Sequence, residues 1–363
     1  MSETQRHVRG EIGGAGTEVG NSFVLPRYQW HLRSSVVPGS ADGLVDTLLE
    51  LRGISRAGAD AFLSPPYEDS LHDPVLLPQC TAAVARLVRA LDAAEPVAIF
   101  GDYDVDGITA SALLADVLRG LGAPVVTVEL PHREEGYGLT GAAVRRLIPP
   151  HTLLITVDNG MSATAAVAEA IARGADVIIL DHHTVQGALP PGALVVHPAL
   201  PSSWYPNAHL AAVAVAWKVA SLLLREKGRA GDEKFLLDLV ALGTLADSMP
   251  LVGENRALVF WGLEVLRRSR RPGFHVLAEQ AGIALSEITA ESAIFKLIPR
   301  LNAAGRLRHA SLALDLVRAT ESADARRYAR ELDAVNTERR QLTEEFFEEA
   351  IRSLPSPLPG ILV

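Results

Sequence analysis

The feature that most constrains the fold is a series of five short aliphatic runs between residues 97 and 196, separated by longer amphipathic stretches. Such runs, without polar alternation, are typical of strands buried on both faces, and the stretches between them are long enough for helices. We therefore predict an α/β fold, a parallel five-stranded sheet flanked by helices. The predicted strands are Val97–Phe100, Val125–Leu130, Leu153–Val157, Val177–Leu180 and Leu194–Val196.

The sequence on either side of the sheet region differs from it. Residues 1–27 are rich in Gly, Ser, Thr and Glu and predict a flexible tail, whereas residues 28–95 have a helical pattern. The sheet domain is expected over residues 96–320, followed by a long connecting helix over residues 321–353. Residues 354–363 end in an apolar run that we interpret as the start of a truncated second domain.

Composition and charge limit the class of protein and the cellular compartment that we expect. Hydrophobic residues make up 48% of the chain, which is enough for a sizeable core. The 34 Lys and Arg against 43 Asp and Glu give a net charge of −9, which argues against sequence-independent coating of nucleic acid. Cys80 is the only cysteine, and neither a membrane-spanning run nor a signal-peptide core is visible. We therefore expect a cytoplasmic protein without membrane contact.

An acidic segment, GDYDVDG at residues 101–107, directly follows the first predicted strand. Its alternate carboxylates, Asp102, Asp104 and Asp106, supply the oxygen ligands that hard divalent cations prefer. An EF-hand loop would need Glu at its twelfth position, where the sequence has Leu113. A phosphatase of the haloacid-dehalogenase type would need downstream Lys and paired-Asp motifs, and the downstream motifs of this chain differ from these. A solvated turn is the third alternative.

Three further segments place Asp or His at the end of a predicted element. Asp158 follows the third strand, the run Asp181–His183 follows the fourth, and Asp247 ends an apolar helix. Each Asp taken alone could equally be a helix cap or a solvated end. An Asp-His-His run at a strand end is not a usual packing choice, and neutral imidazole binds divalent metals.

Taken together, these segments favour a metal centre. The carboxyl ends of parallel strands share one edge of a sheet, so the acids and imidazoles should converge on one crevice. Several carboxylates close together in apolar surroundings are unfavourable unless positive charge compensates them. Four Asp side chains carry −4 and two divalent cations carry +4. This balance fits a two-metal site for in-line displacement at phosphorus, with ions about 3.5–4 Å apart.

These segments, in this order, resemble the DHH phosphoesterase superfamily, and within it the RecJ-type single-strand-specific DNA exonucleases. The Asp-rich segment and Asp181–His183 mark the superfamily, and PRLNAAGR at residues 299–306 points to the RecJ type. Relatives continue into a DHHA1-type domain, so residues 354–363 are expected to begin a truncated domain of that type. Other matching segments are Arg52–Ile54, Phe62–Pro65, EGYGL at 135–139, Ala246-Asp247 with Pro250-Leu251, and GENR at 253–256.

The resemblance implies a role for each of these side chains. Asp158 would bridge two Mn²⁺ or Mg²⁺ ions. His183 would contact the scissile phosphate, as a charge stabiliser or as a proton donor to the leaving oxygen. Asp102 and Asp181 would not bind the ions themselves but would hold the ligands in position. The implied metal ligands are Asp104, Asp106, Asp158, His182 and Asp247.

Outside the metal centre, the resemblance implies that Asn302 and Arg306 hold the phosphate backbone, since a guanidinium grips phosphate at two points. The basic run at residues 267–271 is as well explained by a solvated helix end as by a DNA contact. Two positions depart from the family. Phe100 stands where some members carry His, which predicts a weakly held second ion, and His197 stands where Asn is expected, with its role open.

The function that the resemblance implies is metal-dependent 5′-to-3′ exonuclease activity on single-stranded DNA, releasing mononucleotides in DNA repair and recombination by two-metal hydrolysis. Single-strand-binding protein and a helicase are expected as partners beside the DNA, and this truncated chain is expected to be weakened or inactive. Two alternatives stay open. One is a DHH phosphodiesterase on short oligonucleotides or cyclic dinucleotides, and the other is a non-catalytic DNA-binding scaffold.

Overall fold

The structure is a computed structural model that describes residues 41–132, 135–136, 138–148, 153–185 and 187–354. The tail predicted for residues 1–27 and the strand start predicted within 354–363 fall on residues outside these ranges, apart from Leu354. The chain divides into two compact units, residues 1–59 and 60–363. The first contains α1 (Ala41–Glu50) and the 3-10 turn η1 (Arg56–Gly58), and the second contains the sheet.

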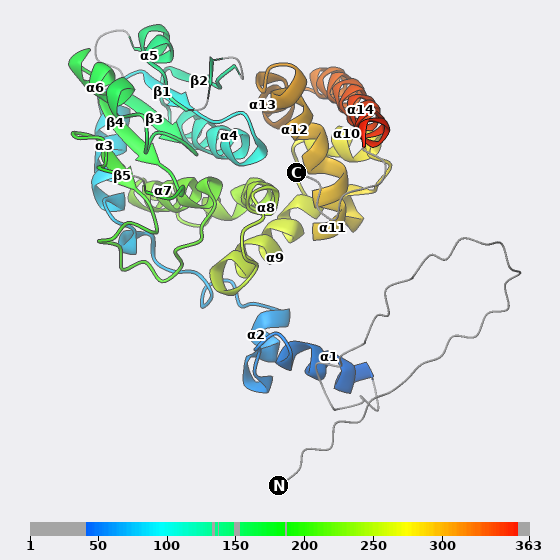
Figure 1. The fold of residues 1–363 in the computed structure, drawn as a ribbon. Helices are drawn as coiled ribbons and strands as arrows, with labels where there is room; N and C mark the ends of the chain where they lie inside the picture. Colours follow the sequence, from blue (N-terminus) through cyan, green and yellow to red (C-terminus); the bar gives the residue numbers. More distant parts are fainter. Residues whose placement is uncertain (1–40, 133–134, 137, 149–152, 186, 355–363) are drawn as a thin grey trace, which may run out of the picture. The chain divides into compact units, whose positions relative to one another are not determined.

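The sheet has five parallel strands in the order β2-β1-β3-β4-β5, as Figure 1 shows. The predicted fold class is thereby confirmed, and each strand begins and ends within one residue of its predicted bounds. From β1 the chain first adds β2 on one side and then crosses back to add β3 on the other side of β1. The direction in which strands are added therefore reverses between β1 and β3. Ligands of such sheets bind at this reversal, beyond the carboxyl ends of the strands. The strands are β1 (Val97–Phe100), β2 (Val126–Glu129), β3 (Leu153–Val157), β4 (Asp176–Leu180) and β5 (Leu194–Val196).

Alternate strand residues face two different helix layers. Ile99 and Ile155 belong to a core shared with α3, α4 and α7, whereas Phe100 and Leu154 belong to a core shared with α5 and α6. Figure 1 shows the same division, with α5 and α6 on one face of the sheet. Both faces are therefore apolar, as the unbroken aliphatic runs predict. These helices are α3 (Cys80–Asp92), α4 (Val105–Gly120), α5 (Gly141–Leu147), α6 (Thr164–Ala172) and α7 (Ala212–Glu226).

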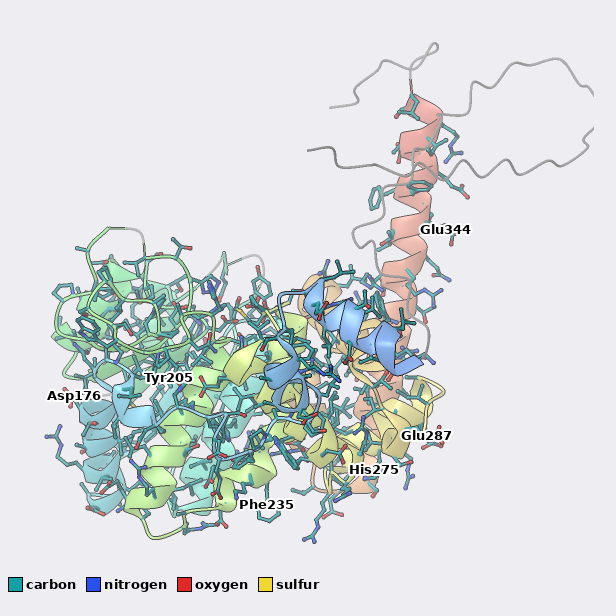
Figure 2. All side chains as sticks on the ribbon, turned by 90° about the horizontal axis from the view of Figure 1, so that it is seen from below. Asp176, Tyr205, Phe235, His275, Glu287 and Glu344 are labelled. Atoms are coloured by element: carbon teal, nitrogen blue, oxygen red, sulfur yellow. The ribbon has the colours of Figure 1, made fainter. Side chains whose placement is uncertain are left out.

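The chain beyond α7 is helical within the described residues and ends in the long helix α14 (Ser322–Ser353). Its first half buries Ala325, Leu332 and Val335, whereas Phe346 beyond it is 67% exposed. In Figure 2, Glu344 lies on the half of α14 that extends past the packed region. None of the helices in the described ranges is long and apolar enough to cross a membrane.

The remaining elements position the loops around the sheet. The helices are α2 (Ala59–Leu63), α8 (Leu237–Ala246), α9 (Gly253–Arg267), α10 (Pro272–Gln280), α11 (Ala290–Ser292), α12 (Ile298–Leu307) and α13 (Ser311–Arg318). The 3-10 turns are η2 (Pro74–Leu76), η4 (Asp232–Leu236) and η5 (Leu285–Glu287), and η6 (Ala293–Leu297) is a π-helical turn that runs into α12.

Candidate metal centre

The Asp-rich loop turns tightly from β1 into α4. Gly107 is required there, because a Cβ at this position would lie 2.5 Å from the backbone nitrogen of Asp102. Asp104 is the N-cap of α4, and its Oδ1 accepts hydrogen bonds from the N–H groups of Asp106 (3.0 Å) and Gly107 (3.1 Å). The loop therefore presents its three carboxylates from a rigid turn at the edge of the sheet.

Asp106 is 1% exposed and is held by a second helix. Its Oδ2 accepts a hydrogen bond from the N–H of Ala212 (2.7 Å) and its Oδ1 from that of Val213 (2.8 Å), at the N-terminus of α7. A helix N-terminus presents unpaired N–H groups and partial positive charge, so it stabilises a buried carboxylate. No local sequence signal identifies these two apolar residues as carboxylate donors.

Asp158 ends β3 in a conformation that few non-glycine residues adopt, with φ +63°, and Gly160 follows with φ +111°. Asn159 supports this turn, since its Nδ2 donates to the carbonyl of Val157 at 2.9 Å. The turn directs the Asp158 carboxylate towards β4, where its Oδ1 lies 3.1 Å from Nε2 of His182. A strained residue that carries a buried charge is typical of a functional site.

The run Asp181–His183 follows β4. Asp181 Oδ1 accepts hydrogen bonds from the N–H of His182 (2.7 Å) and from Nδ1 of His183 (2.7 Å), and its Oδ2 accepts from the N–H of Met161 (3.3 Å). Asp181 therefore orients the imidazole of His183 and holds the backbone of His182. His197, whose role the sequence left open, donates from Nε2 to the carbonyl of His183 at 2.8 Å and so anchors the same loop.

The centre is completed by Asp247, at the end of α8. Its Oδ2 lies 3.6 Å from Nε2 of His182, and Oδ2 of Asp106 lies 3.8 Å from the same atom. Carboxylates from the ends of β1, β3 and α8 thus meet around one imidazole, which follows β4. The groups with ligand atoms within 4.8 Å of one another are Asp158-His182-His183, Asp106-His182-Asp247 and Asp102-Asp104-Asp158.

Four acids of this cluster, Asp102, Asp106, Asp158 and Asp247, have a pKa above the usual value. Burial and the neighbouring Asp104 raise the pKa of Asp102 to about 7 and that of Asp247 to about 6. Burial, with the charges of the surrounding carboxylates, also raises the pKa of Asp106 and of Asp158 well above the usual value. Burial is the largest cause of each shift, and the added repulsion between carboxylates is negative charge that a cation or protons would offset.

The two imidazoles differ in their electrostatics. Burial lowers the pKa of His182 to about 4, so this ring is neutral and suited to metal ligation. The hydrogen bond that His183 donates to Asp181 raises the pKa of His183, whose side chain is 45% exposed. Burial opposes ionisation of Asp181, but its hydrogen bonds and the charge of His183 outweigh that cost and lower its pKa. The exposed ring is therefore the one suited to carrying a proton.

The two residues predicted to contact DNA, Asn302 and Arg306, and the two positions left open, the basic run 267–271 and Phe100, differ in their surroundings. Asn302 lies at the site, where its Oδ1 accepts a hydrogen bond from the N–H of Val105 at 3.0 Å, so it supports the Asp-rich loop. Arg306, one turn further along α12, is exposed. In the basic run 267–271, Arg271 is ion-paired with Asp116 at 2.8 Å. Phe100 is fully buried in the core and contributes no ligand atom.

Comparison with known proteins places this arrangement in a family. Residues 96–244 match the DHH family, N-terminal domain. The single-stranded-DNA-specific exonuclease RecJ of Bacillus subtilis strain 168 is 38% identical over 310 residues, which is 85% of this chain. The chain spans 39% of the length of that relative.

Two solved structures agree with this match. A crystal structure of exonuclease RecJ bound to manganese superposes with a TM-score of 0.71 at 35% identity, covering 77% of this chain and 71% of the other. RecJ from Thermus thermophilus in complex with Mn²⁺ superposes with a TM-score of 0.73 at 32% identity, covering 86% and 44%. The chain belongs to the RecJ group of the DHH family.

Proposed function

We propose that this chain is the catalytic core of a metal-dependent exonuclease that degrades single-stranded DNA from its 5′ end, in repair and recombination. The observation that carries the proposal is the convergence of three carboxylates, those of Asp106, Asp158 and Asp247, on the buried imidazole of His182. Carboxylate oxygens with one neutral imidazole form a donor set that suits Mn²⁺ and Mg²⁺. The RecJ relatives, two of them solved with manganese, support the same function.

The proposed ligands are Asp104, Asp106, Asp158, His182 and Asp247. Asp158 is proposed to serve both ions, because it belongs to two of the three ligand groups. When bound, divalent cations lower the pKa of a coordinated water and offset the charge that develops on a phosphate. Asp181 holds His182 and His183 in place, and Asp102, which accepts the N–H of Tyr103 at 2.8 Å, stiffens the Asp-rich loop.

His183 is proposed to face the scissile phosphate. Its ring is half exposed, its Nδ1 is fixed by Asp181 at 2.7 Å, and its raised pKa favours the protonated form. A protonated imidazole can stabilise charge on the phosphate or donate a proton to the leaving oxygen. Asn302 and Arg306 are proposed to hold the adjacent backbone, where a guanidinium gives a two-point contact.

The direct test uses single-stranded oligonucleotides labelled at the 5′ or the 3′ end, with Mn²⁺ present or chelated. The proposal expects early release of labelled mononucleotide from the 5′-labelled strand only, with no cleavage of blunt duplex. Early release from the 3′ label would contradict the direction. Faster cleavage of dinucleotides or cyclic dinucleotides would favour the phosphodiesterase alternative. Binding of single strands without cleavage at millimolar Mn²⁺ would favour the scaffold.

We also propose single-strand-binding protein and a helicase as partners in a cytoplasmic setting. The support is the family membership and Cys80, a buried free thiol. Co-purification of the chain with either partner, in the presence of nuclease to remove bridging DNA, would test the association. Recovery of neither partner under these conditions would contradict it.

A further inference from the structure

Asn255, near the start of α9, is 1% exposed and is not among the proposed metal ligands. Its side-chain amide is fully hydrogen-bonded to two loops. Oδ1 accepts from Nδ2 of Asn207 at 3.0 Å, and Nδ2 donates to the carbonyls of His209 (2.6 Å) and Pro250 (3.2 Å). A buried amide with every partner on another segment acts as a fixed cross-link between those segments.

The first of the two loops leads into the donors that hold Asp106. His209 stands three residues before Ala212, whose N–H donates to Asp106 Oδ2 at 2.7 Å. The N–H of Val213 donates to the other oxygen at 2.8 Å. A shift of the His209 backbone would therefore move the N-terminus of α7, and with it the carboxylate of Asp106.

The second loop carries Asp247. Pro250 stands three residues after Asp247, and Ser248 between them has φ +55°, a conformation that costs a non-glycine residue energy. The Asp247 side chain is 32% exposed, against 1% for Asp106 and 2% for Asp158. Asp247 therefore depends on its loop for its position more than the two buried acids do.

Asn255 is itself held rigidly by the residue before it. Glu254 is 2% exposed, accepts the hydroxyl of Tyr205 at 2.8 Å and pairs with Nζ of Lys218 at 2.5 Å. Figure 2 labels Tyr205, which stands in the loop between β5 and α7. The start of α9 is thus fixed against both the loop and α7, and Asn255 projects from an anchored backbone.

We propose that Asn255 is a positioning residue of the metal centre, which sets the distance between Asp247 and Asp106 by joining their loops through one amide. The proposal rests on the proposed function, because the spacing of these two acids matters only if they bind metal ions for cleavage. Since supporting residues of this kind change metal affinity about 10- to 100-fold when removed, the effect of Asn255 should be measurable without any nuclease assay.

The test compares Asn255→Ala and Asn255→Asp with Ser269→Ala in the full chain. The Asp variant keeps the size but turns an oxygen towards two carbonyls. Ser269→Ala removes a buried hydrogen bond, to Asp238 at 2.8 Å, in another part of the helical region and is the control for general destabilisation. Calorimetric titration with Mn²⁺ measures ion binding, and amide hydrogen exchange measures the two loops.

We expect both Asn255 variants to weaken the lower-affinity Mn²⁺ site about tenfold or more. We also expect faster exchange at the amides of residues 248, 249, 251 and 252 and at Ala212 and Val213. Ser269→Ala should do neither. Wild-type Mn²⁺ binding and exchange in Asn255→Ala, or changes equal to those of Ser269→Ala, would overturn the proposal. If the wild-type chain bound no Mn²⁺, the proposed function would fail. In that case amide hydrogen exchange alone would test the cross-link. Faster exchange of both loops in the Asn255 variants would support it, and faster exchange of one loop or of neither would refute it.

Discussion

The inner and outer parts of the acidic cluster are built differently. The inner acids, Asp106 and Asp158, are 1–2% exposed and held by backbone N–H groups or by an imidazole. The outer residues, Asp247 and His183, are 32% and 45% exposed, and a loop or one carboxylate fixes them. The inner part has the rigidity needed to define where an ion binds, and the outer part has the access needed to meet a substrate.

This difference has an energetic consequence. Buried carboxylates that repel one another destabilise the chain unless a cation is bound, so the inner part contributes negatively to the stability of the metal-free protein. Active centres commonly carry such a cost in exchange for function. Substitutions that remove or alter one element of the inner or the outer part should therefore have effects of different size and kind.

The largest effect is expected from removal of an inner acid. Asp158→Ala should lower metal-dependent cleavage by about three powers of ten or more, because shared ions contribute several kcal/mol to stabilisation of the transition state. Steady-state cleavage of a single-stranded oligonucleotide measures it. The matched control is Asp176→Ala, at the opposite end of β4 and labelled in Figure 2, which should cleave normally. Wild-type turnover by Asp158→Ala would refute the bridging role.

Next in size is the pH dependence of stability without metal. Asp102 has a pKa of about 7 and Asp247 of about 6 in the folded chain, against the usual value of 3.8. Because these folded-state values are raised, the chain should lose several kcal/mol of stability as pH rises from about 4 to 8. Thermal unfolding in chelator measures the loss. Saturating Mn²⁺ should remove it, and a flat profile in chelator would argue against charge crowding.

A smaller effect is expected in the outer part. His183→Ala should lower turnover about a hundredfold, the usual contribution of a positioned acid, while Mn²⁺ affinity changes little. Asp181→Asn should lower the pKa of His183 and so move the alkaline fall of the rate to lower pH. His275→Ala, on α10, is the matched control. Equal losses of turnover and Mn²⁺ affinity would instead make His183 a metal ligand.

The smallest effect is expected at the exposed rim. Arg306→Ala should raise KM about tenfold and reduce its salt dependence, with kcat nearly unchanged, because a phosphate contact affects binding more than chemistry. Arg326→Ala, an exposed arginine on α14, controls for the loss of one charge. A large fall in kcat with constant KM would place Arg306 in the reaction itself.

The sequence alone predicts the sheet and the acids, since both depend on short local patterns. Strand bounds follow from unbroken aliphatic runs, and Asp158 and Asp181 stand directly after their strands. The supporting contacts could not be predicted in this way. The N–H of Ala212 reaches Asp106 across 106 residues, and Asn302 reaches Val105 across 197. Such pairs depend on helix packing, and no periodicity or motif identifies an apolar residue as a donor.

Anomalous diffraction from crystals of this chain grown with Mn²⁺ tests the central claim most directly. The account predicts two manganese peaks about 3.5–4 Å apart, both within bonding distance of Asp158, with His182 on one and Asp247 close by. Peaks distant from these side chains, or no peak at millimolar Mn²⁺, would contradict it.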